Sequence, residues 1–247
     1  MYSNSFLRPL FFLGSALLVV VLCILPSTKS MFPFWIIARG SFVMDTLFHE
    51  LGHSIFGWLF GNANLPMIFT IFMSDKMGGM AMNLGHWLIL QIAAFIGLAY
   101  LCYYLRYHWL FIPAVVFSVL ILVIYLLGLD MLVIDYMGHG GSIAMGGFFL
   151  YRAFADIAKN KVERWLNAYF GFYLTLSNIF FCYQLTSDPA FLAEYMSPID
   201  HIGHHDMVKV SAQLLVTIQS VATFTMIVGI VTVIGTAIAS LFYTKAD

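Results

Sequence analysis

Long apolar runs separated by short polar segments repeat along the whole chain. A helix needs about 20 mostly apolar residues to cross the hydrocarbon core of a bilayer, and the runs have roughly that length, except for a longer final one. They cover residues 9–25, 35–60, 87–104, 109–127, 138–155, 165–185 and 209–243. The pattern predicts an all-α polytopic membrane protein with about six to seven transmembrane helices, folded as one domain over residues 1–247.

One segment, residues 62–83, breaks this pattern. Its β-branched and aromatic residues, followed by a polar turn that contains Gly78 and Gly79 and by a second short apolar piece, are typical of a hairpin or re-entrant element. A plain connecting loop is the alternative. A hairpin would present a strand edge, and such an edge pairs with an extended polypeptide through main-chain hydrogen bonds.

Composition narrows the class of protein further. Hydrophobic residues make up 62% of the chain and charged residues 9%, which excludes an ordinary water-soluble domain. The 11 basic and 12 acidic residues nearly cancel, so no nucleic-acid partner is indicated. The basic segment 152–164 is expected in the cytoplasm and the acidic, histidine-rich segment 187–206 on the opposite side. Alternation then places the amino terminus outside, although Arg8 opposes that orientation.

The second apolar run carries the sequence His49-Glu50-Leu51-Gly52-His53. Residues four positions apart lie on one face of a helix, so both imidazoles are able to grip one Zn²⁺ while Glu50 reaches a water bound to the ion. Asp45, one turn earlier, is a candidate to orient an imidazole. Hydrogen-bonded helix residues without a metal are the alternative, but such groups are costly inside a membrane segment unless they have a function.

A catalytic zinc usually has three protein ligands, so a third ligand must come from elsewhere in the chain. Ser197-Pro198 is a good helix start, which would put Asp206 about two turns inside a helix, roughly 12 Å from its external end, whereas His53 lies at roughly 10 Å in its own span. These matching depths rank Asp206 first and His205 second. The remaining candidates are His204, His139 and Asp135. The glycines of residues 138–147 indicate tight helix packing or a broken helix.

These features together resemble the site-2 protease family of intramembrane zinc metalloproteases, above all its small bacterial branch. The chain lacks the Asn-Pro-x-Pro and Leu-Asp-Gly elements of the other branch, and Gly203 and Asp206 are separated by one residue more than in the Gly-x-Asp of the bacterial branch. The resemblance implies a single integral membrane metalloprotease-like domain in the bacterial inner (plasma) membrane. It also implies Zn²⁺ on His49, His53 and Asp206, Glu50 as the general base, and a membrane-spanning or membrane-adjacent protein as substrate.

Two other functions are compatible with the same residues. A catalytically silent zinc-binding membrane scaffold would keep the metal ligands and would not need Glu50. A metal or proton transporter would use intramembrane His and Asp residues as an ion path. The ionisable residues gather on one pair of helices and do not line successive spans, which favours the protease.

Overall fold

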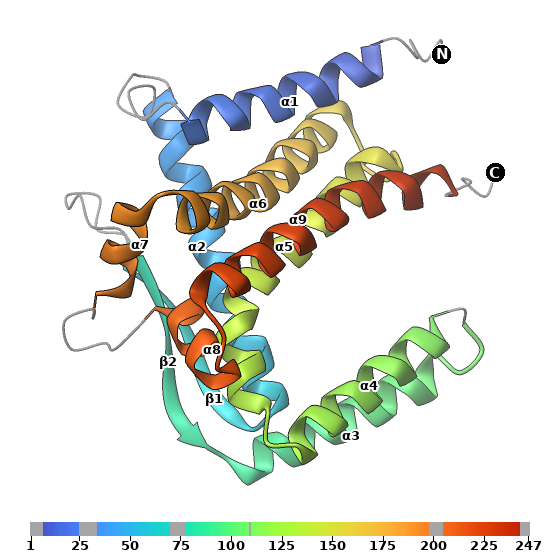
Figure 1. Ribbon diagram of the computed structural model, residues 1–247. Helices are drawn as coiled ribbons and strands as arrows, with labels where there is room; N and C mark the ends of the chain where they lie inside the picture. Colours follow the sequence, from blue (N-terminus) through green and yellow to red (C-terminus); the bar gives the residue numbers. More distant parts are fainter. Residues whose placement is uncertain (1–6, 25–33, 70–77, 109, 198–204, 243–247) are drawn as a thin grey trace.

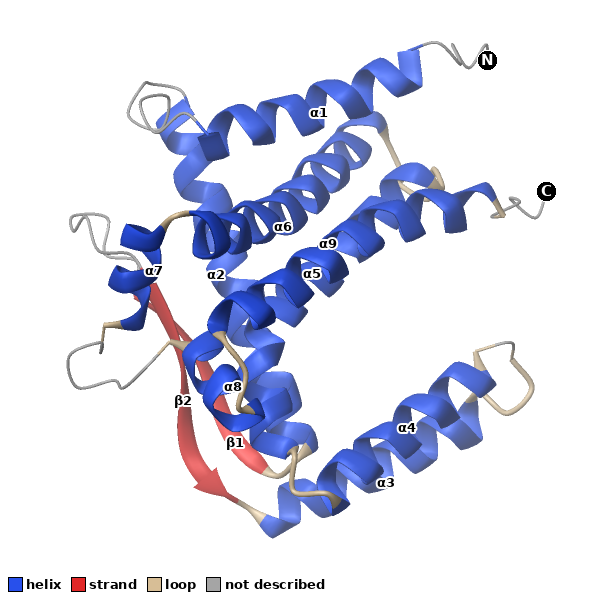
Figure 2. Cartoon of the chain, viewed as in Figure 1, coloured by secondary structure: helices blue, strands red, loops and turns tan. Residues whose placement is uncertain are grey.

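The computed structural model describes residues 7–24, 34–69, 78–108, 110–197 and 205–242 (Figure 1). Figure 2 shows that helices dominate and that two strands form the only sheet of these described residues. The elements are α1 (Leu7–Ile24), α2 (Phe34–Leu59), β1 (Asn62–Phe69), β2 (Gly78–His86), α3 (Leu88–Tyr104), α4 (Phe111–Leu126), α5 (Asp130–Phe154), α6 (Lys161–Ser187), α7 (Pro189–Met196), α8 (Asp206–Leu214) and α9 (Ile218–Leu241).

The hairpin predicted after the second apolar run is confirmed. Strands β1 and β2 pair antiparallel, with Leu65 opposite Met82 and Phe69 opposite Gly78. The register shifts between Asn62 and Asn64, where a bulge interrupts the ladder. The two-stranded sheet packs against α2, the helix that carries the histidine motif. This packing places the hairpin beside the histidine motif.

Two predicted boundaries are wrong. The glycine-rich helix α5 is unbroken and begins at Asp130, not at residue 138. The last apolar stretch is two helices, because Leu215 adopts a left-handed conformation (φ 56°) that ends α8 before α9 begins. Segment 187–206 also contains α7, whose first turn Asp188 caps by accepting from two backbone amides.

The helix start predicted at Ser197-Pro198 is not where α8 begins. Pro198, Gly203 and His204 lie outside the described residues, and Ser197 is the residue that ends α7. Helix α8 begins at Asp206 itself, with His205 before it. Asp206 is therefore at a helix end and not two turns inside a helix, so the depth argument placed it wrongly within its element.

Helix α5 is the central helix, since it packs against α2, α6, α8 and α9. Helices α2 and α5 touch backbone to backbone. A Cβ atom added at Gly52 would lie 1.9 Å from the carbonyl oxygen of Met137, and one added at Gly141 would lie 2.8 Å from the Cα of Gly52. Only glycine permits this approach. The close contact brings the start of α5 against the histidine face of α2.

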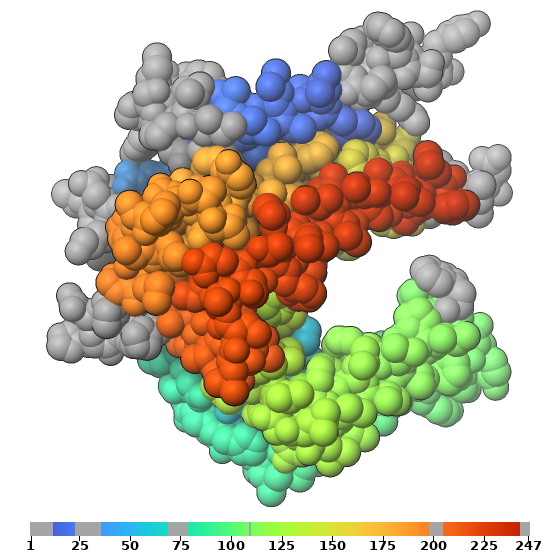
Figure 3. All heavy atoms as spheres, viewed as in Figure 1, coloured from blue at the N-terminus to red at the C-terminus, as the bar shows by residue number. Residues whose placement is uncertain are grey.

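The outer surface is strongly apolar. Among the described helices, α9 alone is long and apolar enough to cross a membrane, while α3, α4 and residues 12–22 of α1 are apolar but shorter. Helices α3 and α4 project as a pair, and Figure 3 shows the surface hollowed between this pair and α9. Their large side chains are exposed, with Ile89 83% and Ile112 71% accessible. The outer faces of α3 and α4 therefore form an exposed apolar surface.

Candidate metal centre

The histidine motif meets Asp206 where α2, α5 and α8 come together. His49 and His53 lie one turn apart on α2, and α8 contributes Asp206 from more than 150 residues later in the chain. The Nε2 atoms of His49 and His53 lie 2.9 and 3.0 Å from Asp206 Oδ2, and 3.2 Å from each other. Three atoms of the kind that bind metals therefore form a small, nearly equilateral triangle.

The size of this triangle fits a zinc ion. Zinc binds nitrogen and carboxylate oxygen at about 2.0–2.2 Å in tetrahedral geometry, which separates neighbouring ligand atoms by roughly 3.3 Å. The three observed separations, 2.9, 3.0 and 3.2 Å, are close to that value. Two imidazole nitrogens and one carboxylate oxygen are also a donor set that zinc prefers.

The hydrogen bonding of His53 supports the same conclusion. Its Nδ1 lies 2.6 Å from the carbonyl oxygen of Ile134, which accepts hydrogen bonds only, so Nδ1 carries the proton. In the neutral ring Nε2 then presents a lone pair to Asp206 Oδ2 and to His49 Nε2. Three close contacts join His49 Nε2, His53 Nε2 and Asp206 Oδ2. One proton would satisfy only one of these contacts, whereas a divalent cation satisfies all three. A ligand imidazole that donates its other N–H to a carbonyl is the usual arrangement around zinc.

Asp206 is held in place by a polar cluster between α5 and α8. Its second oxygen, Oδ1, lies 3.6 Å from Lys209 Nζ, one turn further along α8. Lys209 also lies 3.9 Å from Asp135, which accepts a hydrogen bond of 2.7 Å from Gln213. The carboxylate of Asp135, one of the rival candidates for the third ligand, thus interacts with Lys209 and Gln213. These contacts hold α8 against α5.

The other rival candidates take different positions. The ring of His205 stacks on Tyr195 with centroids 4.3 Å apart. His139 lies closer to the site, because one of its ring nitrogens falls in a group with His49 and Asp206 in which all ligand atoms are within 4.8 Å of one another. That group is wider than the triangle that includes His53, so His49, His53 and Asp206 are the better three-atom site.

Glu50 faces the strand that follows it. The side chain is 5% exposed, and a Cβ atom added at Gly79 would lie 2.7 Å from Glu50 Cγ. Strand β2 therefore passes directly over the carboxylate, and only a glycine fits at this position. Glu50 is therefore shielded from bulk solvent and packs against strand β2.

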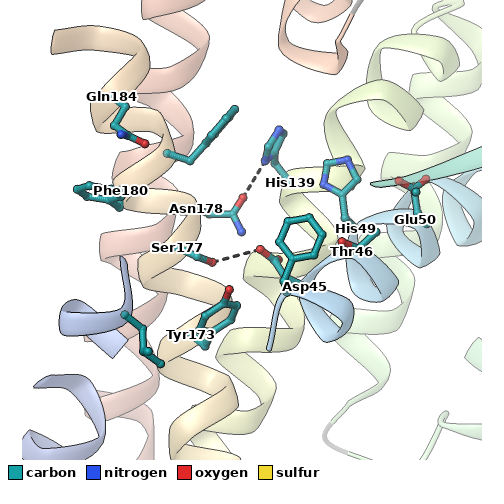
Figure 4. Close-up of a pocket in the computed structure, with 14 residues that line it drawn as sticks. Asp45, Thr46, His49, Glu50, His139, Tyr173, Ser177, Asn178, Phe180 and Gln184 are labelled. Atoms are coloured by element: carbon teal, nitrogen blue, oxygen red, sulfur yellow. Dashed lines mark hydrogen bonds between the residues drawn. The ribbon is translucent and has the colours of Figure 1, made fainter. Parts of the chain in front are cut away.

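Two cavities meet at the site. One, of about 500 Å³, extends along α6 and is shown in Figure 4. The other, of about 630 Å³, extends along β2 and α8. Both are lined by His49, Glu50 and His139. The site thus opens in two directions. In the first cavity the Asp45 carboxylate accepts a hydrogen bond of 3.3 Å from Ser177, so its described contact is with α6.

Gly138 on α5 is an essential part of the site that the sequence did not reveal. A Cβ atom added at this residue would lie 2.4 Å from His53 Nε2 and 2.5 Å from His49 Nε2. The absence of a side chain at Gly138 therefore keeps open the space beside both ligand nitrogens. The glycine run predicted tight helix packing, but which helix it faces could not be read from the sequence.

Gly138→Ala is therefore expected to weaken zinc binding by about 10- to 100-fold, since overpacking typically costs about 1–3 kcal/mol. Competition titration against a chromophoric chelator measures this. Gly140→Ala is the matched control on the same helix, because its Cβ would meet mainly the flexible end of Met137, 2.9 Å away. Equal affinities in the two variants would show that Gly138 does not border the ion.

Comparison of the chain with protein-family models, with curated proteins and with solved structures gives no match. The resemblance to the site-2 proteases therefore rests on the sequence motifs alone.

Proposed function

We propose that the chain is an intramembrane zinc metalloprotease that hydrolyses peptide bonds of membrane-spanning or membrane-adjacent proteins, with Glu50 as general base. One observation carries the proposal. His49 Nε2, His53 Nε2 and Asp206 Oδ2 lie within 3.2 Å of one another, with Glu50 beside them and a cavity on either side. A bare metal-storage site would need neither the carboxylate nor the two openings.

Three residues of the site would bind the ion, and a fourth transfers the proton. His49, His53 and Asp206 would hold the ion, which supplies a Lewis acid able to polarise water and the scissile carbonyl. Glu50, next to His49 on α2, takes the proton from the attacking water and returns it to the leaving nitrogen. Its burial beneath β2 keeps bulk water away from this exchange. Lys209 keeps the Asp206 carboxylate turned toward the histidines.

The shape of the site supports an extended polypeptide as substrate. Residues Gly79 to Ala81 and Asn83 of β2 line the second cavity, so a chain lying there would run along the strand. Strand pairing supplies main-chain hydrogen bonds without demanding a particular sequence. A transmembrane helix would have to unwind locally to bind in this way. The exposed apolar side chains of α3, α4 and α9 support a location within the bilayer.

The proposal is tested by removing and restoring the metal. The purified chain is reconstituted in liposomes with a panel of tagged single-span polypeptides, and cleavage is followed by gel mobility. We expect a chelator to reduce cleavage to background and equimolar Zn²⁺, but not Mg²⁺, to restore it.

Cleavage that persists in metal-free protein would contradict the proposal. Zinc retention with no polypeptide of the panel cut would favour a silent scaffold. Zinc flux into sealed liposomes, with no cleavage, would favour a transporter.

A further inference from the structure

We infer that His139 is a displaceable fourth ligand of this metal centre, presented by Asn178, and that it closes the site while no substrate is bound. This inference rests on the proposed zinc site and adds to it a device that controls access. Three observations carry it: the hydrogen bonding of the His139 ring, its position beside the ligand triangle, and its place between the two cavities.

The hydrogen bonds of Asn178 fix which nitrogen of His139 carries the proton. The Asn178 amide nitrogen donates to the backbone oxygen of Leu174 at 2.9 Å. A carbonyl oxygen only accepts, so this end of the side chain is the NH₂ group and the other end is the oxygen. Asn178 Oδ1 lies 2.7 Å from His139 Nδ1, which must therefore be the N–H (Figure 4). Nε2 of the neutral ring is left as a lone pair.

This arrangement is the one that His53 has. His53 donates Nδ1–H to the oxygen of Ile134 and offers Nε2 to the metal position. His139 donates Nδ1–H to the oxygen of Asn178, which leaves Nε2 as a lone pair. Metal-binding imidazoles in proteins nearly always have such a partner on the second nitrogen.

The position of the His139 ring suits a ligand that binds the ion reversibly. A nitrogen of His139 is within 4.8 Å of the ligand atoms of His49 and Asp206, which is wider than the roughly 3.3 Å between ligands of one tetrahedral zinc. A small movement of the ring would bring it into the shell. The ring stacks on Phe181 with centroids 5.4 Å apart and lies perpendicular to the His49 ring, with centroids 4.8 Å apart.

The consequence concerns access to the site. Structural zinc sites have four protein ligands and catalytic sites keep one position open. With His139 bound, the centre has the closed form. With His139 withdrawn toward Asn178, it has the open form. Because His139 lines both cavities, a polypeptide lying across them would contact the ring and move it aside.

The test is nitrogen NMR of ¹⁵N-histidine-labelled protein in nanodiscs, with the His139 signals assigned from their loss in His139→Gln. Without metal we expect His139 to show a protonated Nδ1 and an unprotonated Nε2. On addition of one equivalent of Zn²⁺ we expect the Nε2 signals of His49, His53 and His139 all to move to the metal-bound position. The response to zinc is read in the wild-type spectrum, and His139→Gln serves only to assign the signals.

The failures are distinguishable. If His49 and His53 respond to zinc while Nε2 of His139 keeps its metal-free position, the fourth ligand is excluded and the three-ligand centre stands. If no histidine responds, the proposed metal centre itself fails.

Asn178→Leu provides a second measurement. We expect it to lower zinc affinity by about 10- to 100-fold, the usual loss when the partner of a ligand is removed. Asn167→Leu is the matched control, a buried asparagine on the same helix that lies eleven residues earlier. Equal affinities for the two variants would overturn the role assigned to Asn178.

Discussion

Asp206→Ala is expected to weaken zinc binding by about 100-fold or more, beyond the 10- to 100-fold that loss of an outer-shell partner costs. The reason is geometric, because Asp206 Oδ2 is the atom that both imidazole nitrogens approach, at 2.9 and 3.0 Å. Without it the two histidines lose the carboxylate oxygen that completes the triangle. Competition titration of the purified variant measures the change in the dissociation constant.

His205→Ala is the control, since His205 precedes Asp206 directly and was the second candidate for the same role. Its ring stacks on Tyr195, so its removal is expected to leave zinc affinity within a few-fold of wild type. Zinc binding that survives Asp206→Ala and is lost in His205→Ala would reverse the assignment of the third ligand.

Glu50→Gln is expected to lower the rate of polypeptide cleavage by about 10²- to 10⁴-fold while zinc content stays unchanged, the range typical for loss of a general base. Glutamine keeps the size and burial of the side chain but cannot accept the proton of the attacking water. The measurement is the initial cleavage rate in liposomes, with zinc per chain determined on the same sample.

Glu194→Gln, an exposed glutamate on α7, is the matched control and is expected to cleave at the wild-type rate. Unchanged cleavage in Glu50→Gln would remove Glu50 from the mechanism. A parallel loss of zinc would mean that Glu50 serves the metal centre and not the proton transfer.

The sequence predicted the elements better than it predicted their ends. Uninterrupted apolar runs placed most helices, and the polar, glycine-containing segment within residues 62–83 placed the hairpin, although Gly78 and Gly79, predicted in the turn, belong to strand β2. The break at Leu215 has no such signal, because leucine has no local preference for the left-handed conformation and its side chain is exposed there. The start of α8 at Asp206 was also missed, because the Ser197-Pro198 pair indicated an earlier helix start.

Part of the site could be predicted from the sequence. The four-residue spacing of His49 and His53 dictates that both lie on one helical face, whatever the rest of the chain does. Long-range contacts were out of reach: the backbone contact of Gly52 with α5, the space left at Gly138, and the pairing of His139 with Asn178. Lys209 had a local signal, since Asp206 and Lys209 are three residues apart and share a face of α8.

One measurement bears most directly on the central claim, that the histidine motif and Asp206 hold a single zinc ion. It is elemental analysis of the chain purified without a histidine tag, beside the double variant His49→Ala/His53→Ala. The structure leads us to expect one zinc per wild-type chain and none in the double variant. A wild-type chain free of zinc after exposure to it, or a double variant that retains one equivalent, would contradict the claim.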